Sequence, residues 1–269
     1  MKCIVFTSYV PTEDKIWVGL EFLNKFVENF KDYDVYIGDS NSCDSWLKTL
    51  DEYKKNLNII YRQVPDYLDS GFGVVGAFQT ALRLLKESGK KYDFCWFGHT
   101  KGVTSNSHKF RNQVFEDFWD IREIVENKMT KEDFIMYSPY ITLTDSVWLN
   151  GTLPLFLDGP DNDSLSSLYA FWVHKGEVIE KFLDSVDPVF FEKDILSFDR
   201  LNYNICYPEH PKVDRYFFER DFPMVYQKLD VGKKVLYRVL DGGHKKYLGD
   251  STIDKKTNNN IFLLDNKYI

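Results

Sequence analysis

Short apolar runs alternate with longer amphipathic segments along the first hundred residues. Four runs are short and bounded by polar or turn residues, as is typical of buried strands: residues 3–9, 34–38, 57–64 and 92–97. Three segments between them repeat apolar positions every three or four residues, which indicates amphipathic helices: residues 15–30, 46–54 and 74–86. This alternation predicts an α/β fold with a Rossmann-like, mostly parallel sheet flanked by helices.

The pattern is less regular after residue 104. Apolar periodicity predicts helices at 110–127, 175–183 and 213–222, and strands at 134–143 and 168–173. A loop rich in Gly, Pro, Asp and Asn covers residues 150–164. Because no internal repeat and no long linker is found, we expect a single domain spanning residues 1–269.

Composition narrows the class of partner and the compartment. The net charge of −7 gives no general attraction to nucleic acid, whereas 17% aromatic residues suit both a core and stacking on sugars or bases. The four cysteines are scattered and form no CxxC, which fits a reducing compartment. No signal sequence and no membrane-spanning window is recognised, so we expect a cytoplasmic protein; association with a membrane surface stays open.

The strongest candidate site follows the apolar run at 92–97. That run leads directly into Gly98-His99-Thr100-Lys101-Gly102. In open α/β sheets ligands bind outside the carboxyl ends of the strands. A titratable imidazole next to a fixed cation and a flexible glycine suits an anionic ligand such as a diphosphate. The alternative is an ordinary polar turn.

Two other strand ends are expected at the same edge. Thr7 and Tyr9 end the first strand, where Tyr9 can stack on a base, and Asp39 and Ser40 end the second. The Asp39 carboxylate can accept hydrogen bonds from a ribose hydroxyl or a base amide. Capping of the next helix is an equally good interpretation of Asp39 and Ser40.

A glycine-rich segment precedes the third expected helix. Gly71-Phe72-Gly73-Val74-Val75-Gly76 fits the G-x-G-x-x-G dinucleotide fingerprint, but it follows the third strand instead of the first. No acidic residue lies at the end of the next strand. We therefore expect Gly71 and Gly73 to let the backbone approach a ligand and to open a helix N-terminus toward it. Helix capping is an equal alternative, and an NAD(P)-dependent oxidoreductase is a minor one.

Later segments hold candidate metal ligands and a candidate base. Asp158, Asp161 and Asp163 share one loop, and oxygen-rich loops can hold Mg²⁺ or Mn²⁺, although the pattern favours a solvated acidic loop. His244 lies in a Gly-rich turn and can reach a phosphate or a metal. Arg215 and Glu219 are spaced i, i+4; partial burial among aromatic residues favours a general base, and the alternative is a surface ion pair.

His99-Thr100-Lys101-Gly102-Val103 resembles a motif of bacterial GT-A type glycosyltransferases. These are related to the rhamnan synthesis F proteins and to small capsular and cell-surface polysaccharide transferases. In that group a strand ends in His-(Thr/Ser)-Lys-(Gly/Lys), where other GT-A enzymes carry Asp-x-Asp. Three further segments resemble the group in the same order: residues 110–118, residues 169–174 and Arg215-Tyr216-x-x-Glu219. The chain departs from the group with Tyr-Ala-Phe-Trp-Val in place of Gly-Asn-Phe-Trp-Trp.

The resemblance implies a GT-A-like fold with a nucleotide-binding half at 1–104 and an acceptor-side half at 105–269. It implies inverting transfer of a hexosyl or deoxyhexosyl group from a nucleotide-sugar donor to a glycan or other hydroxyl acceptor. His99 and Lys101 would offset charge on the departing diphosphate, and Glu219 or a carboxylate of the 158–163 loop would deprotonate the acceptor. Trp172 and Arg215 would contact the acceptor. Use of Mn²⁺ or Mg²⁺ stays open, as does a protein that binds the donor without turnover.

Overall fold

The protein is described here as a computed structural model. It describes residues 1–65, 75–100, 108–132, 134–139, 141–144, 164–167, 171–185, 188–193, 234–237 and 261–263. Within these ranges, none of the helices is both long and apolar enough to cross a membrane.

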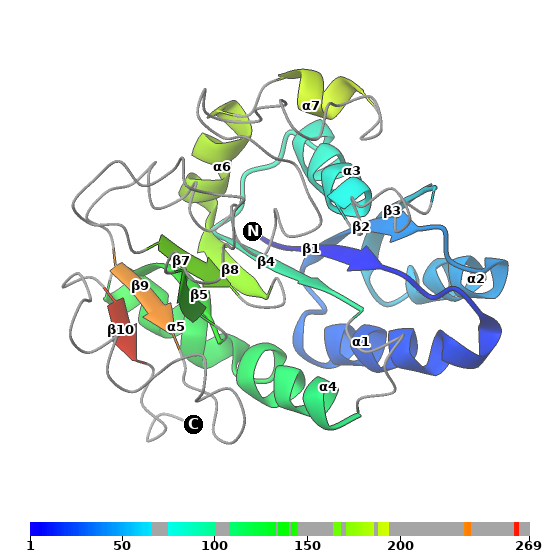
Figure 1. The fold of residues 1–269 in the computed structure, drawn as a ribbon, viewed down its shortest axis with the longest axis horizontal. Helices are drawn as coiled ribbons and strands as arrows, with labels where there is room; N and C mark the ends of the chain where they lie inside the picture. Colours follow the sequence, from blue (N-terminus) through cyan, green and yellow to red (C-terminus); the bar gives the residue numbers. More distant parts are fainter. Residues whose placement is uncertain are drawn as a thin grey trace.

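One large mixed sheet organises the fold (Figure 1). Its eight strands have the spatial order β10-β9-β5-β8-β4-β1-β2-β3. Their bounds are β1 (Lys2–Ser8), β2 (Asp34–Ser40), β3 (Asn58–Val64), β4 (Phe94–His99), β5 (Phe134–Ser138), β8 (Trp172–Lys175), β9 (Lys234–Tyr237) and β10 (Ile261–Leu263). All neighbours pair in parallel except β8, which is antiparallel to both β4 and β5. The predicted α/β fold with a mostly parallel sheet is confirmed.

Helices cover both faces of this sheet (Figure 1). One face carries η1 (Glu13–Lys15), α1 (Ile16–Asn29), α2 (Asp44–Tyr53), α4 (His108–Val114), η2 (Phe115–Trp119) and α5 (Arg122–Lys131). The other carries α3 (Val75–Glu87), α6 (Gly176–Ser185) and α7 (Pro188–Glu192). Because both faces are covered, β1 and β4 are buried along almost their whole length, which explains their continuous apolar sequences.

An aromatic cluster fills the core on the α1 side. The Trp119 ring lies 5.0 Å from Phe26, 5.4 Å from Phe30 and 6.0 Å from Trp96, measured between ring centroids. All four residues are fully buried. The contacts with Phe26 and Phe30 are edge-to-face and the contact with Trp96 is stacked, and both kinds add to the stability that the burial itself provides.

The helix predicted at 110–127 is interrupted, so that prediction was wrong in part. Residues 115–119 form a π-helical turn in which the Asp120 N–H bonds to the Phe115 carbonyl, at 2.8 Å. The Tyr137 hydroxyl, from β5, donates to the Asp117 carbonyl at 2.6 Å. A bond from a distant strand thus supports the irregular turn, and helical periodicity cannot reveal it.

Two predicted strands also differ from the structure. The run at 134–143 is divided: β5 joins the main sheet, and β6 (Ile141–Thr144) pairs with β7 (Ser164–Ser167) in a separate antiparallel sheet. The strand expected at 168–173 is found later, as β8. The helix expected at 213–222 lies outside the described residues, and the division into halves at residue 104 stays a prediction.

Candidate functional site

The strand order places a topological switch point between β1 and β4. The chain runs outward from β1 to β2 and β3, then returns through α3 to place β4 on the other side of β1. Helix α3 packs over β1, β2 and β3, on the face opposite α1 and α2 (Figure 1). The direction of winding therefore reverses between β1 and β4, and open α/β sheets bind ligands outside the carboxyl ends at such a point.

Backbone and hydroxyl bonds fix the two strand ends against each other. The Thr100 N–H donates to the Thr7 carbonyl at 3.0 Å. The Tyr9 N–H donates in turn to the Thr100 hydroxyl oxygen at 2.9 Å. The structure thus brings together the two predicted strand ends, and the Thr100 hydroxyl helps to hold them in place.

Thr7 has a buried hydroxyl at this point of the sheet. The residue is 1% exposed, and no described residue forms a hydrogen bond with its Oγ1. In the sheet register Thr7 lies between Gly38 and His99. A Cβ on Gly38 would lie 1.8 Å from the Ala77 carbonyl oxygen, so glycine at this position lets the first turn of α3 approach the sheet closely. A buried hydroxyl without a partner costs stability and is available to a ligand.

His99 is the last residue of β4 and is half-buried. Its imidazole stacks on Phe171 with a centroid distance of 5.0 Å and an interplanar angle of 20°. The preceding Gly98 makes room for the rings below, because a Cβ there would lie 2.7 Å from Trp119 and 3.0 Å from Phe171. The imidazole is thus held in position at the edge where Thr7 and Tyr9 lie.

Asp39 serves a structural network, which corrects its expected use as a ligand contact. Ser42 donates to it twice, from N–H at 3.0 Å and from Oγ at 2.6 Å. Gln63 Nε2 donates at 3.1 Å, and the Ser8 hydroxyl also donates. Each carboxylate oxygen therefore accepts two bonds, which fills the positions a carboxylate offers. Asp39 is fully buried and leaves no acceptor for a ribose or a base.

The remaining residues of the second strand end differ in exposure. Ser40 is 1% exposed, whereas Tyr9, which follows β1, is half-buried. Asn41 is exposed and has a φ of 48°, the left-handed conformation that asparagine tolerates better than most residues. Helix α2 begins later, after Cys43, so Asp39 and Ser40 are not its N-cap. Gln63 was not expected at this edge, because nothing in its local sequence distinguishes it.

Trp172 belongs to the core and not to an acceptor surface. It is fully buried and stacks between Phe97, at 5.3 Å, and Phe78, at 6.3 Å. Its neighbour in β8, His174, is also fully buried, and desolvation lowers the pKa of that imidazole well below its usual range. Because Trp172 is fully buried among these rings, the structure does not support the predicted direct contact between Trp172 and the acceptor.

Several predicted site residues lie outside the described ranges. They are Gly71, Gly73, Lys101, Gly102, Asp158, Asp161, Asp163, Arg215, Glu219 and His244. Among the residues that are described, no group of three or more His, Cys, Asp or Glu side chains is arranged to hold a metal ion.

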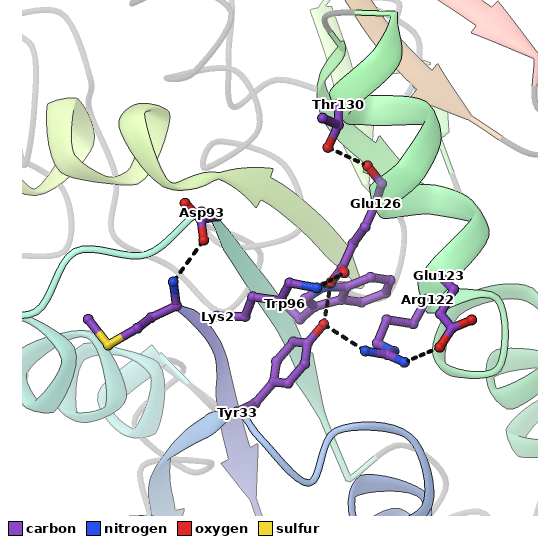
Figure 2. Close-up of polar contacts among 9 residues, drawn as sticks. Lys2, Tyr33, Asp93, Trp96, Arg122, Glu123, Glu126 and Thr130 are labelled. Carbon is purple, nitrogen blue, oxygen red and sulfur yellow. Dashed lines mark hydrogen bonds and ion pairs between the residues drawn. The ribbon is translucent and has the colours of Figure 1, made fainter.

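A second polar cluster lies toward the amino ends of the strands, opposite the carboxyl ends described above (Figure 2). Glu126 of α5 accepts hydrogen bonds from the Trp96 indole, at 2.9 Å, and from the Tyr33 hydroxyl, and it pairs with Lys2. Burial and the Glu126 charge both raise the pKa of Tyr33. A solvent-open hollow of about 1020 Å³ lies beside this cluster, and its lining includes Lys2, Phe94 and Glu126. Sequence reasoning did not identify this cluster.

Comparisons with known proteins give few matches. No protein-family model matches the chain, and no curated protein matches it. Among solved structures, TarS 1–349 from S. aureus matches at 16% identity and a TM-score of 0.38, over 69% of this chain and 50% of that one. TarS 1–349 in complex with UDP-GlcNAc matches at 15% identity and a TM-score of 0.38, over 69% and 48%. The chain spans about half the length of TarS 1–349, and a match of this degree assigns no activity to it.

Proposed function

We propose that the protein is a glycosyltransferase that binds a nucleotide-sugar donor at the carboxyl ends of β1 and β4. The reversal of winding between these strands, with their ends joined through Thr100, is the observation that carries the proposal. The motif that begins at His99 supports it, because its resemblance to GT-A transferases falls on the same strand end. A cytoplasmic location is part of the proposal.

Each donor contact follows from the chemistry of the strand ends. The Thr7 hydroxyl has no hydrogen-bond partner among the described residues and can bond to a ligand oxygen. Tyr9 is half-buried and offers a ring on which a base can stack. Because His99 is half-buried and held by Phe171, it can face the diphosphate without moving. These groups bind and orient the donor; they do not by themselves supply a fixed positive charge.

We assign the fixed positive charge to Lys101, two residues beyond the end of β4. A cation there offsets the negative charge that develops on the departing diphosphate. Glu219 is proposed to remove the proton from the acceptor hydroxyl, which attacks the sugar from the face opposite the nucleotide. Arg215 is proposed to contact the acceptor. Asp158, Asp161, Asp163 and His244 are the residues we propose for Mn²⁺ or Mg²⁺, if transfer requires either.

A donor-binding protein without turnover remains the second candidate, because the described residues explain binding better than chemistry. An oxidoreductase is less well supported. The glycine-rich segment precedes α3, which follows β3, whereas the dinucleotide fingerprint belongs to the turn after the first strand.

Direct titration with nucleotide sugars tests the proposal. The purified chain is titrated with UDP-, GDP- and dTDP-sugars, with and without Mn²⁺, and with NADH for comparison. UDP-GlcNAc, which one TarS structure contains, is the first donor to use. Binding together with release of the free nucleotide diphosphate supports transfer. Binding of a nucleotide sugar without release of its nucleotide diphosphate, whichever acceptor is added, supports a donor-binding protein without turnover. Binding of NADH but of no nucleotide sugar contradicts both the transferase and the donor-binding protein.

Substitution of Lys101 separates binding from chemistry. We expect Lys101→Ala to lower the rate of transfer by roughly 10²–10³-fold, the usual cost of removing one charge-stabilising group. Lys91→Ala is the matched control, because Lys91 is exposed, lies at the opposite edge of the sheet and pairs with Glu180 on the surface. Transfer within twofold of wild type in a folded Lys101→Ala protein removes this residue from the mechanism.

A further inference from the structure

Two cysteines face each other inside the sheet. Cys3 on β1 and Cys95 on β4 are directly opposite in the register, and their Sγ atoms are 3.3 Å apart. Both are free thiols, 0% and 1% exposed. Adjacent strands are about 4.8 Å apart. That spacing lies within the range of Cα separations that a disulfide bridges, roughly 4.4–6.8 Å.

The pair lies near an opening at the amino ends of the strands. Lys2 and Phe94, the chain neighbours of Cys3 and Cys95, both line the solvent-open hollow of about 1020 Å³. Solvent therefore comes within one residue of each cysteine. A small local opening of this edge is enough to admit a reagent of low molecular weight.

A dithiol is the best description of this pair. His174 lies opposite Cys95 on β8, but within the described part of the chain Cys3, Cys95 and His174 are not arranged to hold a metal ion. Cys43 is at the start of α2 and is half-buried, separate from the pair. Cys3 and Cys95 are therefore placed to react with each other.

We propose that Cys3 and Cys95 form a reversible oxidation site, in which a low-molecular-weight disulfide converts the two thiols into one intramolecular disulfide. One cysteine thiolate attacks a sulfur of the reagent, which releases one thiol and leaves a mixed disulfide. The second thiolate attacks the protein sulfur of that mixed disulfide and releases the second thiol. The protein loses two hydrogens, and the reagent disulfide is reduced to two thiols.

The surroundings of the two cysteines determine how fast they are oxidised, and their separation in sequence determines how much the disulfide stabilises the fold. Burial and the neighbouring Cys95 raise the pKa of the Cys3 thiol. Since the thiolate is the reacting form, oxidation should be slow at neutral pH and become faster as the pH rises. The bond would join positions 92 residues apart in sequence. Such a link restricts the unfolded chain and should raise the temperature of unfolding.

The experiment uses the whole chain, fully reduced and then incubated with glutathione disulfide in buffer without denaturant. After acid quenching and alkylation, peptide mapping under non-reducing conditions should find a peptide that links Cys3 to Cys95. The midpoint of thermal unfolding should rise by several degrees and return to its starting value after treatment with dithiothreitol.

Three variants make the result specific. Cys43→Ser should form the same link, whereas Cys95→Ser and Cys3→Ala should form none and show no reversible rise in midpoint. The proposal is overturned if no link forms in the folded protein, if it appears only in urea, or if Cys3 pairs with Cys43 or Cys206 instead. Peptide mapping of the wild-type protein decides this even if one variant fails to fold.

Discussion

Two buried carboxylates lie at opposite ends of the strands of the central sheet, and they are satisfied by different kinds of partner. Asp39, at the carboxyl edge, accepts only from neutral groups among the described residues: the hydroxyls of Ser8 and Ser42, the Ser42 N–H and the Gln63 amide. Glu126, at the amino edge, accepts from Tyr33 and Trp96 and also pairs with the Lys2 ammonium (Figure 2).

The Glu126 cluster has its own cation, whereas the described partners of Asp39 include none. The carboxyl ends of the strands therefore need positive charge from another residue if they are to bind an anion. At Glu126 a cation balances the carboxylate inside the protein. At Asp39 the described partners distribute the negative charge without neutralising it. An anionic ligand at that edge therefore requires a cation from elsewhere, which is the place we assign to Lys101 in the proposed mechanism.

The largest expected effect comes from breaking the amino-edge cluster. Glu126→Ala leaves the Tyr33 hydroxyl, the Trp96 indole and the Lys2 ammonium without their acceptor. Each buried donor left without its acceptor typically costs about 1–3 kcal/mol, and the Tyr33 and Trp96 donors are both buried, so the combined cost is about 2–6 kcal/mol. We expect a loss of this size in the free energy of unfolding, measured by urea titration.

Glu123→Ala is the control for that change. Glu123 lies on the same helix, but its side chain is 80% exposed and pairs with Arg122 at the surface. Its removal should change the free energy of unfolding by less than about 1 kcal/mol. Equal losses in the two variants would show that Glu126 is not the centre of the cluster.

Asp39→Asn is expected to have the second largest effect. An amide nitrogen in place of one carboxylate oxygen would face donors that now point at Asp39, and leave some of them unpaired. We expect a loss of about 1–3 kcal/mol in the free energy of unfolding. Because the network lies under the proposed site, donor binding should weaken too; unchanged stability would contradict the network.

Strands β1, β2 and β4 could be predicted because they are buried along almost their whole length, so their sequences are largely apolar. The edge strand β3 is mostly exposed, and only its short apolar start indicated it. The carboxyl edge could also be predicted, since parallel strands place their ends together. The partners of Asp39 could not, because Ser8 and Gln63 lie 31 and 24 residues away and meet it only through strand pairing. Likewise β8 runs antiparallel, and nothing in the sequence of this four-residue strand encodes its direction.

A pH titration tests the buried imidazole of β8. Desolvation lowers the pKa of His174 below its value of 6.5 in the unfolded chain, so the unfolded state binds a proton that the folded state does not. Stability from this group is complete above pH 6.5 and is lost as the pH falls below it, by up to about 1.4 kcal/mol per pH unit. In His174→Gln the free energy of unfolding should fall less steeply below pH 6.5, by the slope that corresponds to one proton. If the wild-type and variant curves of this free energy against pH are parallel, His174 does not have a lowered pKa.

The smallest effect on stability is expected at Thr7, where the carboxyl edge is open to a ligand. Thr7→Val replaces a buried hydroxyl that no described residue bonds by a methyl group, so the free energy of unfolding should stay unchanged or rise by up to about 1 kcal/mol. If a donor bonds to this hydroxyl, its affinity should fall roughly 2–10-fold. Ser8→Ala is the matched control, because the neighbouring hydroxyl is bonded to Asp39 and Trp46 and its loss should destabilise the fold. A destabilised Thr7→Val protein would show that the hydroxyl is structural, and would place the donor elsewhere on this edge.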